Sequence, residues 1–204
     1  MISIYQIKPK FQQLLAPILK CLARTGVSPN QITVGTTLLL TVYGSALFLN
    51  PEQTPLWFGL PVVLLLRMAS NAIDGMLAVS TQQQTPFGAL LNELCDVIAD
   101  IALYLPFIAL SGVSSSTLLA VLFTAFLTEF SGVLALSVGS QRGHDGPMGK
   151  SDRAFAFGVL AVMVGFGVKG AWINGFLVLI LALHLLTIFN RVRSALAAQP
   201  INQS

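Results

Sequence analysis

The sequence has 204 residues, of which 54% are hydrophobic and only 9% are charged, and its mean hydropathy is +0.78. This composition excludes an ordinary soluble domain and indicates several membrane-spanning segments, because one spanning helix needs about 20 mainly apolar residues. The net charge of +3 gives no reason to expect nucleic acid as a partner, and two cysteines, Cys21 and Cys95, are too few for a disulfide framework.

The first 30 residues are expected to lie along a membrane surface. Three lysines and Arg24 interleave with apolar side chains, which is typical of an amphipathic helix whose basic face meets anionic lipid. No short apolar core precedes a small-residue cleavage site, so we expect no cleavable signal peptide. The stretch 26–30, GVSPN, should end this helix and begin the next one, with Ser28 or Asn30 as the cap.

Six apolar segments follow, each long enough or nearly long enough to cross a membrane. We therefore predict an all-α membrane protein with six transmembrane helices preceded by the amphipathic interfacial helix. Residues 1–204 would form a single domain, divided into an interfacial segment (1–30), a six-helix bundle (31–190) and a cytoplasmic tail (191–204). The predicted helices cover residues 31–49, 56–79, 87–110, 115–139, 154–168 and 172–190.

The lysines and arginines predict the orientation, because cytoplasmic loops carry an excess of these residues. With six spans, the basic residues of the N-terminal segment, of the loop after the fourth helix and of the tail fall on one side. Lys169 falls on the other side. We expect an integral protein of a bacterial inner membrane, with both termini on the cytoplasmic side. The loop between the second and third helices falls on the same side, so an active site near that loop would be cytoplasmic too.

The segment from Asn71 to Asp100 holds four of the eight acidic residues of this apolar chain. Asn71 and Asp74 share one helix face, while Asn92, Asp96 and Asp100 form a stripe on the next helix. Carboxylates buried in a membrane are costly unless they have a partner. Oxygen ligands from two helices suit a hard divalent cation such as Mg²⁺. The two faces are therefore candidates for a metal site.

The spacing of these residues resembles the signature of the CDP-alcohol phosphatidyltransferase family, D-x2-D-G-x2-A-R-x8-G-x3-D-x3-D. The stretch 26–33, GVSPNQIT, is similar to the family's junction between the interfacial helix and the first span. The resemblance extends over the whole topology and implies a membrane transferase of phospholipid biosynthesis. With every spacing kept, the chain reads Asn71-x2-Asp74-Gly75-x2-Ala78-Val79-x8-Gly88-x3-Asn92-x3-Asp96.

Three positions depart from the signature, since Asn71 and Asn92 replace aspartates and Val79 replaces an arginine. Each asparagine keeps an oxygen ligand but loses a negative charge, so we expect weaker metal binding or fewer metals. The missing arginine removes a phosphate contact. Nearby residues are candidates to compensate, namely the supporting acids Glu93 and Asp100 and, for a phosphate, Arg67.

The resemblance implies transfer of a phosphatidyl group from a CDP-linked lipid, such as CDP-diacylglycerol, to an alcohol, with release of CMP. It makes Asp96 the base that deprotonates the acceptor hydroxyl. It also implies a homodimer, although neither the acceptor nor a dimer face follows from the sequence. The implied Mg²⁺ or Mn²⁺ site comprises Asn71, Asp74, Asn92 and Asp96, and the implied donor-binding residues are Asp74, Gly75, Ala78 and Gly88.

Charged residues outside the signature each allow two interpretations. Lys150 and Arg153 would bind a phosphorylated acceptor or a lipid head group, or only anchor the topology. Glu129 would face the site, as expected of a carboxylate in a membrane helix, or make a structural hydrogen bond. His144 and His184 are expected to be structural or incidental.

Two other functions are compatible with these residues. A degenerate family member would bind a CDP-lipid or a partner with little turnover, as the three replacements suggest. A small transporter would line an ion pathway with its intramembrane acids, Asp74, Asp96, Asp100 and Glu129, but we find no inverted repeat or broken helix of the usual kind. In a purely structural interpretation, the side chains of the signature would only make polar contacts that hold packed helices together.

Overall fold

The computed structural model describes residues 8–168 and 170–198, with side chains from residue 11 onward. Over these ranges the chain is helical and contains no strand. The elements are α1 (Lys8–Thr25), α2 (Pro29–Leu49), α3 (Thr54–Ser80), α4 (Pro86–Tyr104), the 3₁₀ helix η2 (Leu105–Ala109), α5 (Ser115–Ser137), α6 (Lys150–Gly165) and α7 (Gly170–Ala197).

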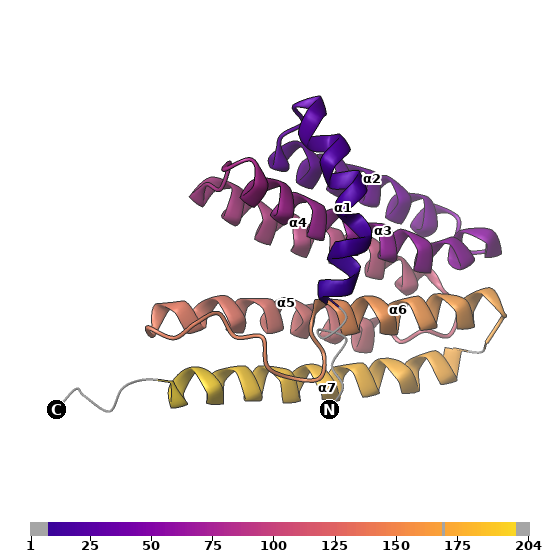
Figure 1. Cartoon of the computed structure of the whole chain (residues 1–204). Helices are drawn as coiled ribbons and strands as arrows, with labels where there is room; N and C mark the ends of the chain where they lie inside the picture. Colours follow the sequence, from indigo (N-terminus) through magenta and orange to yellow (C-terminus); the bar gives the residue numbers. More distant parts are fainter. Residues whose placement is uncertain (1–7, 169, 199–204) are drawn as a thin grey trace.

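The helices form two groups, one above the other in Figure 1. In the upper group α2 packs against both α3 and α4, and in the lower group α5 packs along α7. Contacts between α3 and α6 join the groups, and α1 crosses the upper group and packs on α3. The candidate site residues of α3 and α4 therefore face a boundary that α5 and α6 also reach.

The boundary between α1 and α2 follows the expected local chemistry. Gly26 ends α1 with a φ of +75°, a conformation that glycine adopts without strain. The Ser28 hydroxyl accepts a hydrogen bond from the Gln31 backbone N–H at 3.3 Å, and the Gln31 side chain accepts one from the Ser28 N–H at 2.9 Å. This capping box confirms the predicted helix start and identifies Ser28 as the cap. Pro17 lies inside α1 without dividing it.

Three predicted helix ends differ from the structure by four residues or more. The third predicted helix changes from α to 3₁₀ geometry at Leu105, immediately before Pro106. α6 begins four residues earlier than expected, where the Asp152 carboxylate accepts the Gly149 N–H at 3.1 Å. α7 continues seven residues past the predicted end, so Arg191 is a buried helical residue and the predicted tail is partly helical.

Aromatic side chains form the centre of the packing. The rings of Tyr104 and Phe157 stack at 3.8 Å, and the rings of Phe107 and Trp57 meet edge to face at 4.7 Å. All four side chains are almost completely buried. They connect α3, α4, η2 and α6 into one core, which fixes how these helices are placed around the site.

Four of the described helices, α2, α3, α5 and α7, are long and apolar enough to cross a membrane. Large apolar side chains such as Leu39 and Leu66 point outward from them, and exposed apolar surface on this scale needs lipid or a partner to cover it. The predicted all-α membrane protein is thus confirmed. α4 carries three carboxylates and α6 has 16 residues, so the count of six spans stays a prediction. Lys169 lies outside the described residues.

Candidate functional site

The two polar faces predicted on neighbouring helices meet. The Asn71 amide on α3 donates a hydrogen bond to Asp96 Oδ1 on α4. The Asn92 amide on α4 donates one back to Asp74 Oδ2 on α3 at 3.0 Å. Each of the two asparagines that replace signature aspartates therefore contacts one of the two aspartates that the chain keeps.

Asp74 lies in a tight, buried setting on α3. Its Oδ2 also accepts a hydrogen bond from the Thr33 hydroxyl of α2 at 2.7 Å, a contact that the sequence did not reveal. Thr33 belongs to the GVSPNQIT stretch, so that stretch contributes a side chain to the site as well as a helix cap. Asp74 Oδ1 is buried and has no hydrogen-bond partner among the described residues.

Asp96 binds two cations from outside the signature. The Lys150 Nζ lies 2.5 Å from Asp96 Oδ2. The Arg67 Nη2 lies 3.5 Å from Asp96 Oδ1 and donates to the Asp96 backbone oxygen at 3.1 Å. One turn along α4, Asp100 pairs with Arg67 at 2.6 Å and with Arg153 at 2.7 Å. Arg67 thus bridges both aspartates.

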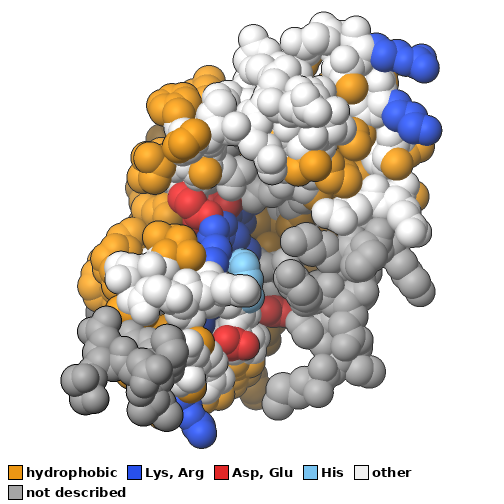
Figure 2. All heavy atoms as spheres, turned by 60° about the vertical axis from the view of Figure 1, so that its left-hand side comes forward, with side chains coloured by type: hydrophobic (Ala, Val, Ile, Leu, Met, Phe, Trp, Pro, Cys, Tyr) orange, Lys and Arg blue, Asp and Glu red, His pale blue; other side chains and the backbone are white. Residues whose placement is uncertain are grey.

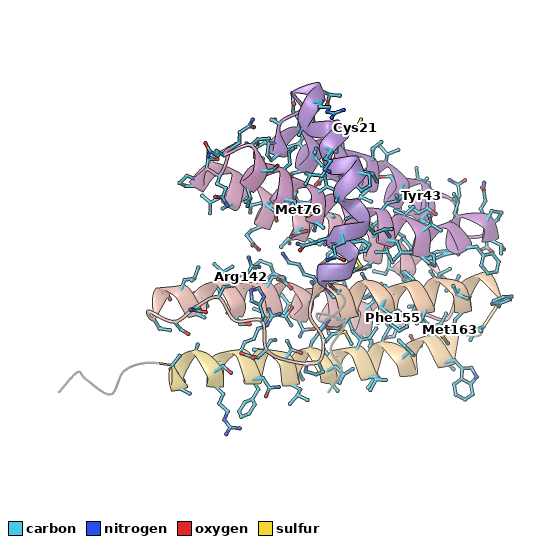
Figure 3. All side chains as sticks on the ribbon, in the orientation of Figure 1. Cys21, Tyr43, Met76, Arg142, Phe155 and Met163 are labelled. Atoms are coloured by element: carbon cyan, nitrogen blue, oxygen red, sulfur yellow. The ribbon has the colours of Figure 1, made fainter. Side chains whose placement is uncertain are left out.

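Arg142, in the loop between α5 and α6, is a site residue that sequence reasoning counted only toward topology. It donates to both carboxylate oxygens of Glu93, at 2.9 Å for the Nη2–Oε2 pair, and lies 3.5 Å from Glu129 Oε2. In Figure 3 it lies between the two groups of helices. Burial, and then the charge of Arg191, lower the pKa of the Arg142 guanidinium below its usual value.

Arg153 of α6 is completely buried and is bound on all sides. Besides Asp100, it contacts Glu129 Oε1 at 3.1 Å and the Thr128 hydroxyl at 3.1 Å. Glu129 therefore reaches the same ion pairs from α5, and its role in the site stays a prediction. A phosphate contact by Arg153 stays a prediction, and it would require this side chain to leave carboxylates that it already binds.

Arg191 of α7 anchors the loop that carries Arg142. It donates to the backbone oxygens of Thr128 and, at 3.3 Å, of Asp145. Nearby, the Met148 N–H donates to the Thr187 hydroxyl at 3.0 Å. His184 lies on α7 two turns before Arg191 and is buried. Its Nδ1 atom lies 3.0 Å from the Thr124 hydroxyl, as expected of a structural histidine.

The ion pairs of the described residues connect one set of eight side chains, which we call the charged cluster. It contains four cations and four carboxylates, drawn from α3, α4, α5, α6 and the loop before α6. Side chains of both charges gather between the two groups of helices in Figure 2. The members are Arg67, Arg142, Lys150, Arg153, Glu93, Asp96, Asp100 and Glu129.

A cavity of about 550 Å³ lies between α1 and α3, next to the signature. Asn71, Gly75 and Val79 line it from α3, and Gln12 and Leu19 line it from α1. A methyl group added at Gly75 would meet no atom within 4 Å, so the glycine leaves the helix backbone accessible there. Val79, at the arginine position of the signature, is 61% exposed.

The other expected donor-binding residues lie in different surroundings. Ala78 is half-buried on α3. At Gly88, a Cβ atom would lie 3.0 Å from Asn30 Oδ1, so this glycine allows the start of α4 to approach the start of α2.

The donor set around Asp74 and Asp96 fits a divalent cation only with its amides included. The histidines, cysteines and carboxylates that the structure describes form no group of three able to hold a metal. The unpartnered Oδ1 of Asp74 is an oxygen of the kind such a cation binds. Asn71 and Asn92 would have to supply amide oxygens beside the two aspartates, which gives a site with less charge than four carboxylates would.

The fold and the charged cluster define an all-helical integral membrane protein whose polar site is enclosed between helices. A family model for CDP-alcohol phosphatidyltransferases matches residues 26–189. The chain therefore belongs to the CDP-alcohol phosphatidyltransferase family and is a transferase, as the signature spacing predicted.

Curated relatives agree with this assignment. The inner membrane protein YnbA of Escherichia coli is 45% identical over 195 residues, which cover 95% of this chain and 96% of YnbA. A phosphatidylinositol phosphate synthase of Corynebacterium glutamicum is 36% identical over 104 residues, 51% of this chain and 45% of that protein. The first of these likenesses extends over nearly the whole chain.

Solved structures share the fold. The phosphatidylinositol phosphate synthase of Mycobacterium tuberculosis with CDP-DAG bound matches with a TM-score of 0.77 at 22% identity, over 94% of this chain and 98% of that one. The same enzyme in complex with manganese and citrate matches with a TM-score of 0.75 at 22% identity, over 92% of each chain. At this identity the likeness establishes the fold alone.

Proposed function

We propose that this protein transfers a phosphatidyl group from a CDP-linked lipid, such as CDP-diacylglycerol, to an alcohol and releases CMP. The observation that carries the proposal is the reciprocal pairing of Asn71 with Asp96 and of Asn92 with Asp74. It brings the matched positions of the signature together across α3 and α4. Relatives named as phosphatidylinositol phosphate synthases support the same reaction class.

Asp96 is the proposed base. The acceptor oxygen bonds to the lipid-side phosphorus, the bond from that phosphorus to the oxygen kept by CMP breaks, and the hydroxyl proton passes to Asp96. Lys150 and Asn71 hold the Asp96 carboxylate from two directions. A carboxylate held in this way is oriented before the acceptor arrives, which favours the proton transfer.

Asp74 and Asp96, with the amide oxygens of Asn71 and Asn92, would hold Mg²⁺ or Mn²⁺. When bound, the metal supplies Lewis-acid stabilisation of the charge that develops on the diphosphate. Asp74, with its hydroxyl contact to Thr33, is fixed for this role by its own helix and by α2. A crystal structure of a related fold that contains manganese supports a divalent cation.

The CDP group would enter the cavity between α1 and α3. Gly75 leaves room there for the nucleotide to approach the helix backbone. α1 would lie at the membrane surface, so that the polar nucleotide reaches the site from water while the acyl chains stay in lipid. The earlier donor-binding predictions for Ala78 and Gly88 remain part of this proposal.

The proposed topology has six spans, from α2 to α7. The charged side chains of α4 are paired within the protein, which is how membrane helices tolerate them. Both termini and the site would lie in the cytoplasm. The homodimer implied by the family stays a prediction.

The test is release of radiolabelled CMP from CDP-diacylglycerol by purified protein in detergent, with Mg²⁺ or Mn²⁺ and a panel of alcohols. We expect metal-dependent release that one acceptor stimulates and that Asp96→Asn abolishes. Glu52→Gln, an exposed carboxylate in the turn before α3, is the matched control and should retain activity. Binding of CDP-lipid by folded protein without release for any acceptor would refute turnover and favour the degenerate binder.

A further inference from the structure

We propose that the acceptor is a hydroxyl-rich alcohol that carries no phosphate group and no net charge. This inference rests on the proposed transferase function and narrows its substrate class. It follows from the charge balance around Asp96, where four cations face four carboxylates in one connected set of ion pairs. A phosphorylated acceptor needs a cation that the protein has left available, and the charged cluster has none to spare.

Two of the four cations are enclosed. The Arg153 side chain is 0% exposed and binds Asp100 and Glu129. The Arg67 side chain is 3% exposed and binds Asp96 and Asp100. Removing either guanidinium from its carboxylates would leave uncompensated buried charge, which is strongly unfavourable.

The other two cations, Arg142 and Lys150, reach the edge of the cluster but are paired there. Arg142 makes a two-point contact with Glu93. The Lys150 ammonium lies within 4 Å of Glu93, Asp96 and Glu129. If Asp96 turned to another partner, Lys150 would still have two carboxylates beside it.

Arg191 of α7 lies near the charged cluster, but its guanidinium is not free to bind a phosphate. It is 4% exposed, and its guanidinium is used by the backbone oxygens of Thr128 and Asp145. A phosphate brought here would therefore meet cations that are already paired with carboxylates or hydrogen-bonded to the backbone, which leaves little attraction to offset its loss of water.

The same edge suits hydroxyl groups. Glu93 is 27% exposed and lies between Arg142 and Lys150, so carboxylate oxygens and cationic N–H groups alternate along it. A hydroxyl donates one hydrogen bond and accepts others. Adjacent hydroxyls of a polyol would donate to Glu93 while accepting from the flanking cations, without breaking the charge balance.

The test compares matched acceptor pairs: glycerol with glycerol 3-phosphate, and inositol with inositol phosphate. Two readouts are used on the full chain in detergent, CMP release from CDP-diacylglycerol and equilibrium binding of the radiolabelled acceptor. We expect the unphosphorylated member of a pair to bind at least about tenfold more tightly and to support faster release of CMP. The phosphate of the other member would lose at least one charged hydrogen bond to water that no free cation in the site replaces. Tighter binding of the phosphorylated member would overturn the inference.

A variant tests the charge balance itself. Glu93→Gln removes one of the four carboxylates at nearly constant shape and leaves the cluster with a net positive charge. We expect it to bind the phosphorylated acceptors about tenfold more tightly than the wild type, while Glu52→Gln leaves binding unchanged. No gain in Glu93→Gln would overturn the inference. Because binding is read without turnover, loss of CMP release for all acceptors would refute the transferase proposal separately.

Discussion

The Nζ atom of Lys150, the first residue of α6, lies 2.5 Å from Oδ2 of Asp96, in the middle of α4. An aspartate of the signature thus has its strongest charge partner in a helix that begins 54 residues later in the chain. The contact links the proposed base to the lower group of helices and makes the arrangement of α6 part of the candidate active site.

We predict that Lys150→Met lowers the rate of CMP release by about tenfold or more, because it removes the cation that orients the proposed base. Lys150→Arg keeps the charge and should retain more activity. Lys20→Met, at an exposed position on α1, is the matched control and should change the rate little. Equal rates for Lys150→Met and wild type would contradict a role for this contact.

The sequence predicted the centre of the site better than its edge. Asn71, Asp74, Asn92 and Asp96 could be placed together because i, i+3 and i, i+4 spacings fix one face of a helix. The place of Arg142 could not be predicted, because no periodic pattern governs a loop. Its position depends on tertiary contacts, chiefly those of Arg191 with the backbone.

Helix ends show the same division. The helix start at Ser28 could be predicted because the two residues of its capping box are three residues apart in the sequence. The extension of α7 to Ala197 could not, because the polar residues near Arg191 interrupt the apolar run although Arg191 itself is buried against α5. In the sequence alone, a buried arginine near the end of an apolar segment cannot be distinguished from an arginine that only marks the cytoplasmic side of the membrane.

Arg153→Met should destabilise the fold strongly, by about 3–5 kcal/mol, because it leaves Asp100 and Glu129 with a lost buried partner. The double variant Arg153→Met with Asp100→Asn should recover part of the loss, since the unpaired charge is then removed as well. Thermal unfolding in detergent measures both. Arg193→Met, at an exposed position on α7, is the control. If Arg193→Met lost as much stability as Arg153→Met, the buried ion pairs would not be the cause of the loss.

Restoring the two aspartates of the signature should make the protein depend on metal for stability. Asn71→Asp with Asn92→Asp sets four carboxylates close together and removes two amide donors that now bind Asp96 and Asp74. Without a cation these charges repel, so the unfolding temperature in EDTA should fall below that of the wild type. Adding Mg²⁺ or Mn²⁺ should raise the unfolding temperature of the variant more than that of the wild type. An equal metal response in both proteins would contradict the proposed ligand positions.

Val79→Arg should strengthen binding of the CDP-linked donor. Val79 lines the cavity between α1 and α3 and is exposed, and an arginine there would meet the diphosphate with paired N–H donors. We expect a KM for CDP-diacylglycerol lower by about tenfold, in line with one charged hydrogen bond. Val79→Leu, which adds size without charge, should leave the KM nearly unchanged. A lowered KM in both variants would show that the cavity binds the donor through apolar contact instead.

Gly44 should be indispensable to the packing of α2 against α4. A Cβ atom at Gly44 would overlap the backbone oxygen of Ala102 on α4, whereas one at Gly35, on the same helix, would meet nothing within 4 Å. Gly44→Ala is therefore expected to lower stability by about 1–3 kcal/mol through overpacking. Gly35→Ala should be neutral or stabilising by up to about 1 kcal/mol, since alanine favours the helix. Both variants add one methyl group, so the difference between their unfolding temperatures in detergent isolates the close approach. Equal temperatures would mean that α2 and α4 are not packed this closely.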